Sequence, residues 1–440
     1  MNAKLPPLAV IATTDISGVT RGRPVRLDRL EDYAAAGVGW VPANISLTAF
    51  NAIADPNPWG SQGDLRLLPD LGAVFTTSGT GAATPFALVA GDIVRLDGRP
   101  WSCCSRTILK QAIADLEAET GLRLLATFEL EFQIFGADLP EAHAFSVGAL
   151  RRADPFASEV LAALEEAGVE PEMFLAEYGE DQFEITLAPA DALAAADRAV
   201  AVREIIREVA RNKGWQASFS PKTSLDGVGN GVHIHFSLRD GQDQPAGYDP
   251  AQPGCLSAAA GAFCAGILSH LPALTAITAP SIPSYYRLQP HYWSAAWTWL
   301  GERDREASLR ICPIAGLSGK DPARQHNIEY RAADSTANPY LSLAGLIRAG
   351  LEGIRRKLPA PPIFSGDPAL LTEGERTELG LRRLPETLEQ ALAAFEADDR
   401  VCGWFDSVFI ETYLGVRRQE MKILASSEAD EICARYRTLF

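Results

Sequence analysis

Four segments of this chain alternate strictly between apolar and polar residues, and their polar positions carry the chemistry of metal ligands. They span residues 127–134, 182–187, 232–238 and 327–331. A period of two is typical of a β-strand with one face in a hydrophobic core. The sequence therefore predicts four strands whose other face presents mainly carboxylates, imidazoles and amides.

Carboxylates gathered on one sheet face repel one another unless cations neutralise them. Six side chains on or near these strands are candidate metal ligands: Glu129, Glu131, Glu177, Glu184, His233 and Glu329. Oxygen ligands with a single imidazole suit Mg²⁺ or Mn²⁺ rather than zinc. Such ions usually serve phosphate chemistry, and four arginines supply forked donors for carboxylate or phosphate, namely Arg287, Arg305, Arg310 and Arg331.

The alternative is a set of ordinary structural residues. A single Glu-x-Glu on a strand is more often a solvated face, and His235 alone is more often a hydrogen-bonded structural histidine. Four separate strands with the same anomaly favour the metal site.

Composition excludes several classes of partner. A net charge of −16 over 440 residues argues against nucleic acid and anionic membranes, which need basic patches. We find no uninterrupted apolar stretch of bilayer length and no signal-peptide core, so a cytoplasmic protein is expected. Seven cysteines without a Cys-x-x-Cys pair predict reduced thiols rather than disulfides or a zinc site.

The order of elements favours an α+β fold. Residues 1–100 are predicted to form a small β-rich domain, with short strands at 8–12 and 39–42. Helices are predicted over 106–120, 191–213, 385–398 and 404–426, and from Asn338 towards Lys357. Strands and helices mix after residue 100 without a regular βαβ rhythm, which argues against a doubly wound sheet.

Beyond these patterns, a series of motifs occurs in the order found in the glutamine synthetase family. They are Glu129-Leu-Glu131, Glu177 with Gln182-Phe-Glu184, Phe219-Ser-Pro-Lys222, Gly231-Val-His-Ile-His-Phe-Ser-Leu238, Arg287-Leu-Gln-Pro290, Arg305 with Arg310, and Ile328-Glu-Tyr-Arg331 with Asp334 and Asn338-Pro-Tyr340. The stretch from Asp15 to Arg23 resembles the amino-terminal domain of the γ-glutamyl-polyamine synthetase branch. The resemblance implies a β-grasp-like domain over 1–100. It also implies a catalytic domain over 101–440, with a curved antiparallel sheet flanked by helices, as in glutamine synthetases and guanidino kinases.

The resemblance also implies a role for each candidate residue. Glu131, Glu177 and Glu184 would hold one metal ion, and Glu129, His233 and Glu329 the other. His235 and Arg310 would contact the phosphates of ATP, with Ser237 and Lys222 near the nucleotide. Arg305 would stabilise charge during phosphoryl transfer, while Arg287 with Gly229 would hold the acid substrate and Arg331 its reacting acyl group. Family members are homo-oligomeric rings, usually dodecamers of two stacked hexamers.

The chain departs from the family pattern where ammonia is bound. The flap that carries an acid in ammonia-using members reads His291-Tyr-Trp-Ser294, with Trp293 at the acid's position. The segment 45–53, where a second acid is expected, contains none. Val228, Asn327 and Asp181 stand where the family has Asn, Arg and Gly.

These features predict an ATP-dependent carboxylate–amine ligase that forms a γ-glutamyl amide with an amine larger than ammonia. Polyamines, ethanolamine and aromatic amines are the candidates, and Trp293 and Trp297 favour an apolar or aromatic amine. Three alternatives stay open. They are a catalytically idle ring protein with a scaffold or sensor role, a true glutamine synthetase, and a kinase whose product is a stable phosphate.

Overall fold

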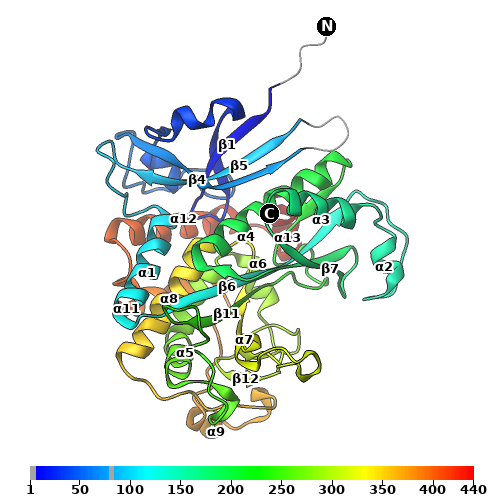
Figure 1. Ribbon diagram of the computed structural model, residues 1–440, viewed down its shortest axis with the longest axis vertical. Coiled ribbons are helices and arrows are strands. Elements are labelled where there is room, and N and C mark those ends of the chain that lie inside the picture. The colour runs from blue at the N-terminus through cyan, green and yellow to red at the C-terminus, as the bar shows by residue number, and fades with distance from the viewer. Residues whose placement is uncertain (1–5, 79–83) are drawn as a thin grey trace.

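A nine-stranded sheet forms the centre of the larger part of the chain in the computed structural model, which describes residues 6–78 and 84–440 (Figure 1). Its strands lie in the order β12-β13-β14-β11-β6-β8-β7, and β9 and β10 also pair with β6. All pairs are antiparallel except β12 with β13. The strands are β6 (Arg123–Phe135), β7 (Pro171–Ala176), β8 (Gln182–Leu187), β9 (Ala190–Asp191), β10 (Gln216–Ser218), β11 (Val232–Arg239), β12 (Leu300–Glu302), β13 (Leu309–Ile311) and β14 (Ile328–Ala333).

The four alternating segments form β6, β8, β11 and β14, as predicted. Along β6 the alternation is visible in burial, since Phe128, Leu130 and Phe132 are almost fully buried while Glu129 and Glu131 are half-buried. The apolar side chains join one core with residues of the helices α4 (Ala192–Asn212), α5 (Ala258–Thr278) and α8 (Pro339–Arg355). The polar face is therefore the one left for a site.

The helices predicted from a terminal glycine or a capping asparagine also form. The helix α1 (Ser105–Thr120) ends at Gly121, whose φ of 68° is the left-handed conformation that glycine adopts readily. Asn338 caps α8, because its side-chain oxygen accepts the N–H groups of Tyr340 and Leu341. The other helices are α2 (Val147–Arg151), α3 (Phe156–Glu166), α6 (Ile282–Arg287), α7 (Pro322–Gln325), α9 (Glu373–Glu378), α10 (Leu388–Ala397), α11 (Asp399–Cys402), α12 (Ser407–Leu424) and α13 (Ala429–Leu439).

The helix α5 corrects the expectation that no apolar stretch reaches bilayer length. By length and composition its 21 residues are sufficient to cross a membrane. In the fold, however, 78 % of its most apolar window is buried, and it packs on α8 and α10. It is a core helix that is apolar on all sides, which is why no polar stripe marks it in the sequence. All seven cysteines are free, as predicted, and five of them are buried.

A second, five-stranded sheet is built by the N-terminal residues (blue in Figure 1) in the order β2-β1-β5-β4-β3. Its strands are β1 (Leu8–Thr14), β2 (Thr20–Arg26), β3 (Val38–Trp40), β4 (Leu65–Thr77) and β5 (Phe86–Val94), joined in part by the 3₁₀ helices η1 (Leu27–Tyr33) and η2 (Pro42–Ser46). The strands β1 and β5 are parallel, and the other pairs are antiparallel.

Buried polar contacts fix the N-terminal sheet to the rest of the chain. The guanidinium of Arg106 on α1 is 2 % exposed and donates to Asp70 and Asp92 of the N-terminal sheet and to Asp197 of α4. The amide of Asn338 donates to two backbone carbonyls at the end of β1. A buried arginine shared by three carboxylates is stable only while all of them stay in place.

Candidate active site

Strand register alone brings most of the predicted ligands together. In the antiparallel ladders Glu131 lies opposite Glu184, Glu129 opposite His233, and Glu329 opposite both His235 and Arg310. Directly opposed residues have β-carbons about 5 Å apart, so their side chains meet on one face of the sheet. Glu177 joins them from the turn between β7 and β8, where its N–H donates to the carbonyl of Gln182.

The imidazole of His233 lies close to several of these carboxylates. The Nδ1 of His233 is 3.5 Å from a carboxylate oxygen of Glu129 and 3.5 Å from one of Glu329, and its Nε2 is 4.0 Å from Glu131. One ligand atom each from Glu129, Glu184 and His233 falls within a 4.8 Å group. The donors are mainly oxygens with one nitrogen, which is the set that fits Mg²⁺ or Mn²⁺.

The charges on this face are poorly balanced by the protein itself. Burial, followed by the charge of Glu131, raises the pKa of Glu177 to about 7. Burial, followed by the charges of Glu129 and Glu131, raises the pKa of Glu184 to about 9. Against its own burial, Glu129 has a lowered pKa because His233 and His235 hydrogen-bond to it. A bound cation would remove the repulsion that raises the first two values.

Two arginines and two histidines surround Glu329, which is 1 % exposed. Arg310 donates to one carboxylate oxygen at 2.7 Å, and Arg331 donates to the other. Burial alone would raise the pKa of Glu329, but His233 and Arg331 hold it at about 2. Glu329 is therefore ionised and fixed in one orientation, as a metal-ligating carboxylate requires.

Arg287 lies buried where the chain leaves α6, close to Gly229. Its Nη2 donates to the carbonyl of Ala333 at 2.7 Å, while its Nε is buried with no partner among the described residues. A β-carbon at Gly229 would lie 2.5 Å from the Cγ of Arg287, so only glycine leaves room for this side chain. A buried guanidinium with spare donors is suited to a carboxylate ligand.

The flap 289–294 carries the predicted substrate residue Trp293. Its indole is 67 % exposed and the neighbouring Tyr292 is 62 % exposed. Trp293 and His291 have φ values of 53° and 66°, a left-handed conformation that costs a non-glycine residue about 1–2 kcal/mol. Arg331 donates to the Trp293 carbonyl at 3.1 Å, so the flap is tied to the arginine that also holds Glu329.

Trp297, in contrast, is a packing residue. Its ring lies half-buried with the guanidinium groups of Arg376 and Arg383 at 5.3 and 5.9 Å from its centroid. These contacts give Trp297 a packing role, and its contribution to an amine pocket stays a prediction.

The phosphate-contacting candidate His235 is oriented by Asn327. The Nδ1 of His235 is 2.8 Å from the Oδ1 of Asn327, and its Nε2 is 3.2 Å from Glu129. Against burial, Cys312 and Glu129 raise the pKa of His235 well above its ordinary value, so the ring is a cation beside the carboxylates. The Asn at position 327 therefore has a structural function in this chain.

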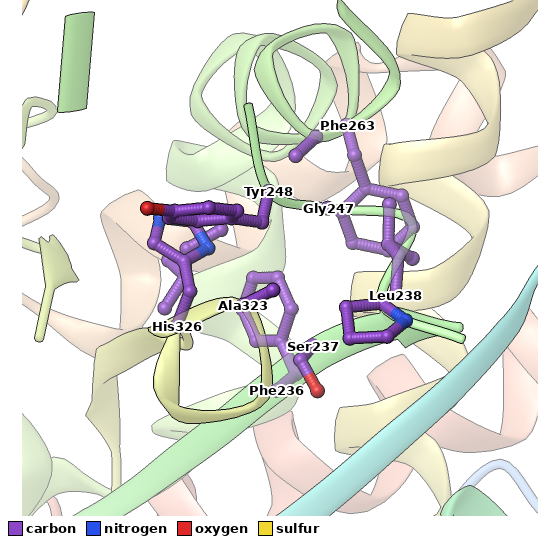
Figure 2. Close-up of a pocket in the computed structure, with 11 residues that line it drawn as sticks. Phe236, Ser237, Leu238, Gly247, Tyr248, Phe263, Ala323 and His326 are labelled. Carbon is purple, nitrogen blue, oxygen red and sulfur yellow. The ribbon is translucent and has the colours of Figure 1, made fainter. Parts of the chain in front are cut away.

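Ser237 stands two residues further along β11 and lines a cleft of ≈ 320 Å³, its open mouth included. Figure 2 shows the rings of Tyr248 and His326 on one side of this cleft, with Phe263 and Leu238 across from them. The two rings are in edge contact, with centroids 5.5 Å apart. The cleft is aromatic-lined and lies at the end of β11, beyond His235.

Lys222 lies at the other end of β11, where it bridges to Gly229. Its ammonium donates to the carbonyls of Leu225 and Gly227 and lies 5.4 Å from the ring of Tyr292 on the flap. Arg305 is exposed, and its carbonyl accepts the Nε of Arg331.

The remaining departures from the family pattern have local explanations. Asp181 has a φ of 51°, which explains a glycine at this position elsewhere, and its carboxylate pairs with Arg152 at 2.9 Å. Val228 packs against Gly179 in the turn that carries Glu177. The acid-free segment 45–53 packs on the C-terminal helices, where Glu420 accepts the N–H of Ala49.

Two residues of the site escape sequence reasoning. The thiol of Cys312 on the chain after β13 lies 3.6 Å from His235 and 3.8 Å from Glu329. The carboxylate of Glu306 accepts two N–H groups of the flap. No local pattern in the sequence marks either residue as part of the site.

Comparison with known proteins identifies this arrangement. A family profile described as the glutamine synthetase catalytic domain matches residues 102–436, and one described as the glutamine synthetase N-terminal domain matches residues 2–101. The chain is 37 % identical to a gamma-glutamylpolyamine synthetase, GlnA3, of Streptomyces coelicolor, over 97 % of this chain and 92 % of that protein. It is 32 % identical to a glutamine synthetase of Thermococcus kodakarensis, over 90 % of this chain and 85 % of that protein.

Solved structures agree with this family. One described as a novel glutamine synthase homolog superposes with a TM-score of 0.92 at 42 % identity, covering 100 % of both chains. A complex of GmaS with ADP superposes with a TM-score of 0.80 at 26 % identity, over 97 % of this chain and 95 % of that one. The chain therefore belongs to the glutamine synthetase family and is an enzyme of the carbon–nitrogen ligase class.

Proposed function

We propose that this enzyme uses ATP to join the side-chain carboxylate of glutamate to an amine larger than ammonia. The observation that carries the proposal is a contrast within one site. All six candidate metal ligands are present together with Arg287, Arg305, Arg310 and Arg331, although Asn327 replaces one arginine of the family pattern. By contrast, neither Trp293 nor any residue of 45–53 supplies an acid for ammonium. The 37 % identity to a protein named as a gamma-glutamylpolyamine synthetase supports a larger amine as well.

The metal-binding residues are Glu131, Glu177 and Glu184 for one ion, and Glu129, His233 and Glu329 for the other. The raised pKa values of Glu177 and Glu184 support this assignment, because two unneutralised carboxylates lie where cations would stabilise them. When bound, Mg²⁺ or Mn²⁺ neutralises phosphate oxygens and the charge that spreads over them during transfer.

The arginines divide the work of binding and activating the acid. Arg287, with its spare buried donors, grips the α-carboxylate beside Gly229. Arg331 holds the reacting acyl group, and Arg305 enters from the exposed loop to balance charge on the phosphoryl group. His235 and Arg310 contact phosphates, and Ser237 with its aromatic cleft receives the nucleotide base. Lys222 lies near the nucleotide, and its ammonium also supports the flap through the ring of Tyr292.

The reaction then follows from carboxylate chemistry. A carboxylate is inert to amines, so the γ-phosphoryl group of ATP first moves to the side-chain oxygen, giving an acyl phosphate and ADP. The amine nitrogen attacks the acyl carbon, and inorganic phosphate leaves with the electron pair of the broken C–O bond. The amine loses a proton, and the product is a γ-glutamyl amide. Polyamines, ethanolamine and aromatic amines remain the candidate nucleophiles, with the exposed rings of Tyr292 and Trp293 available to a cation or an apolar amine.

We further propose a cytoplasmic homo-oligomer, a dodecamer of two stacked hexamer rings, with only small molecules as substrates. Light scattering coupled to size exclusion measures the ring directly. A monomeric active enzyme would overturn this assembly.

A coupled assay of ADP release, with glutamate and a panel of amines, tests the reaction. We expect turnover with at least one polyamine, ethanolamine or aromatic amine that exceeds turnover with ammonia at equal concentration. Ammonia outrunning every larger amine would identify a true glutamine synthetase instead. Titration calorimetry with Mn²⁺ and ATP separates the idle alternative, because an idle ring protein would bind neither.

A further inference from the structure

One carboxylate holds the flap that carries Trp293. The Oε1 of Glu306 accepts the N–H of Trp293 at 2.6 Å, and its Oε2 accepts the N–H of His291 at 3.1 Å. Glu306 is half-buried and forms no ion pair within residues 6–78 and 84–440. Its own N–H donates to Asp304 at 2.9 Å, so the loop on both sides of Arg305 is ordered as well.

The two residues that Glu306 binds are the strained ones. His291 and Trp293 both have a positive φ and exposed side chains, and the ring of His291 lies 3.6 Å from the carboxylate of Asp367. Ser294 anchors the end of the flap through a bond to the carbonyl of Arg287 at 2.7 Å. Between these points the flap backbone depends on Glu306 for its N–H groups and on Arg331 for the Trp293 carbonyl.

These bonds connect the flap to Arg331 and, through it, to the loop of Arg305. Arg331 reaches Trp293 with Nη2 and the carbonyl of Arg305 with Nε. Glu306 directly follows Arg305 in the chain and binds the flap from the same loop.

We infer that Glu306 is the positioning residue of the amine site. By accepting two N–H groups of the flap it holds the flap in place and sets where the rings of Tyr292 and Trp293 stand for an incoming amine. This inference rests on the proposed ligase function, and it assigns the choice of amine to a residue outside the flap. Glutamate is required because a carboxylate accepts on both oxygens, whereas the amide of glutamine has one acceptor and would turn donors towards a second N–H.

The test compares Glu306→Ala, Glu306→Gln and Glu306→Asp with Glu302→Gln. Glu302 is an exposed carboxylate on β12 of the same region. Among the residues that the structure describes it pairs only with its neighbour Arg303, at 3.6 Å, so it is a matched control. For Glu306→Ala we expect the KM of the preferred amine to rise about 10-fold or more, with the KM of ATP and of glutamate unchanged within about twofold. ADP release without amide formation should increase, since water reaches the acyl phosphate.

Conservative variants and a readout independent of activity complete the design. The rise in the KM of the amine should be smaller in Glu306→Asp than in Glu306→Ala, and Glu306→Gln should lie between these two variants. Chymotrypsin cleavage after Tyr292 or Trp293, mapped by mass spectrometry, should quicken about 10-fold in Glu306→Ala and stay unchanged in Glu302→Gln. Unchanged cleavage, or an equal loss for ATP, glutamate and amine, would overturn the inference. If the wild-type enzyme joins no amine at all, the proposed function fails, while the cleavage rates still decide whether Glu306 holds the flap.

Discussion

The strand face and the flap of this active site are held in place by different physical means. On the strands, Glu129, Glu131, Glu184 and His233 are placed by ladders of backbone hydrogen bonds, over a core that α4, α5 and α8 cover. The flap has no ladder, and three side chains, Glu306, Arg331 and Ser294, hold its backbone. Register fixes all positions on a strand at once, whereas a flap held by single contacts changes with one substitution.

This difference explains how one family retains its reaction while the amine varies. The phosphoryl chemistry needs several charges at fixed distances, which a sheet provides. The choice of nucleophile needs only the shape and charge of a pocket mouth, which loops provide. We call the strand face with its candidate ligands the strand half, and the flap 289–294 the flap half. The following predictions test how far these two halves act independently.

The largest effect is expected on the strand side, from Glu329→Ala. The substitution removes a proposed metal ligand and leaves the buried Arg310 and Arg331 without their carboxylate. We expect kcat/KM for ADP release to fall by about 10³-fold for every amine alike. Glu329→Gln separates lost charge from lost shape, and a selective loss for one amine would show that the two halves are not separate.

Removal of divalent ions should lower the stability of the strand half more at high pH than at low pH. The raised pKa values of Glu184, about 9, and Glu177, about 7, lie above those of the unfolded chain. Their contribution to stability is therefore present at low pH and is lost as pH rises through these values. In thermal unfolding after chelation, the gain in Tm on adding Mn²⁺ should be greater at pH 8.5 than at pH 6 by about 2 °C or more. Equal gains at both pH values would contradict the metal assignment.

A tryptophan pair tests the flap half. Trp293→Ala removes an exposed ring, so we expect Tm to be unchanged while the preference among amines shifts about 10-fold. Trp297→Ala removes a ring from between Arg376 and Arg383, so Tm should fall while amine preference is retained. Competition assays with paired amines, together with thermal unfolding, measure both. The reverse pattern would place Trp297, not Trp293, at the amine.

The smallest effect is expected at Asn327, which lies on the strand side where the family pattern has an arginine. Asn327→Ala removes the partner of His235 Nδ1. One hydrogen bond stabilises by about 1 kcal/mol, so the KM of ATP should rise about fivefold with the KM of glutamate unchanged. Initial rates at varied ATP are sufficient to detect this, and an unchanged KM would mean that His235 is oriented without Asn327.

The strands were predictable from the sequence because alternation reports burial residue by residue. The pattern around Glu129 and His233 is therefore sufficient to identify the side of the sheet that carries the candidate ligands. The helix α5 was not predictable in the same way, because a helix that is buried on all sides has no polar stripe. Glu306 and Cys312 depend on partners 13 and 77 positions away in the chain, and local patterns contain no information on such contacts.

The ion cluster of Arg106 has a consequence for how the molecule unfolds. Two of its aspartates belong to the N-terminal sheet and one to α4, and the guanidinium between them is almost completely excluded from water. Unfolding the N-terminal sheet alone would leave that buried cation without two of its carboxylates. The free-energy cost would be comparable to a large share of a domain's net stability. Heat should therefore melt the chain in one cooperative step, and neither part is expected to survive as a separately expressed fragment. A division at residue 100 would then not be a thermodynamic boundary.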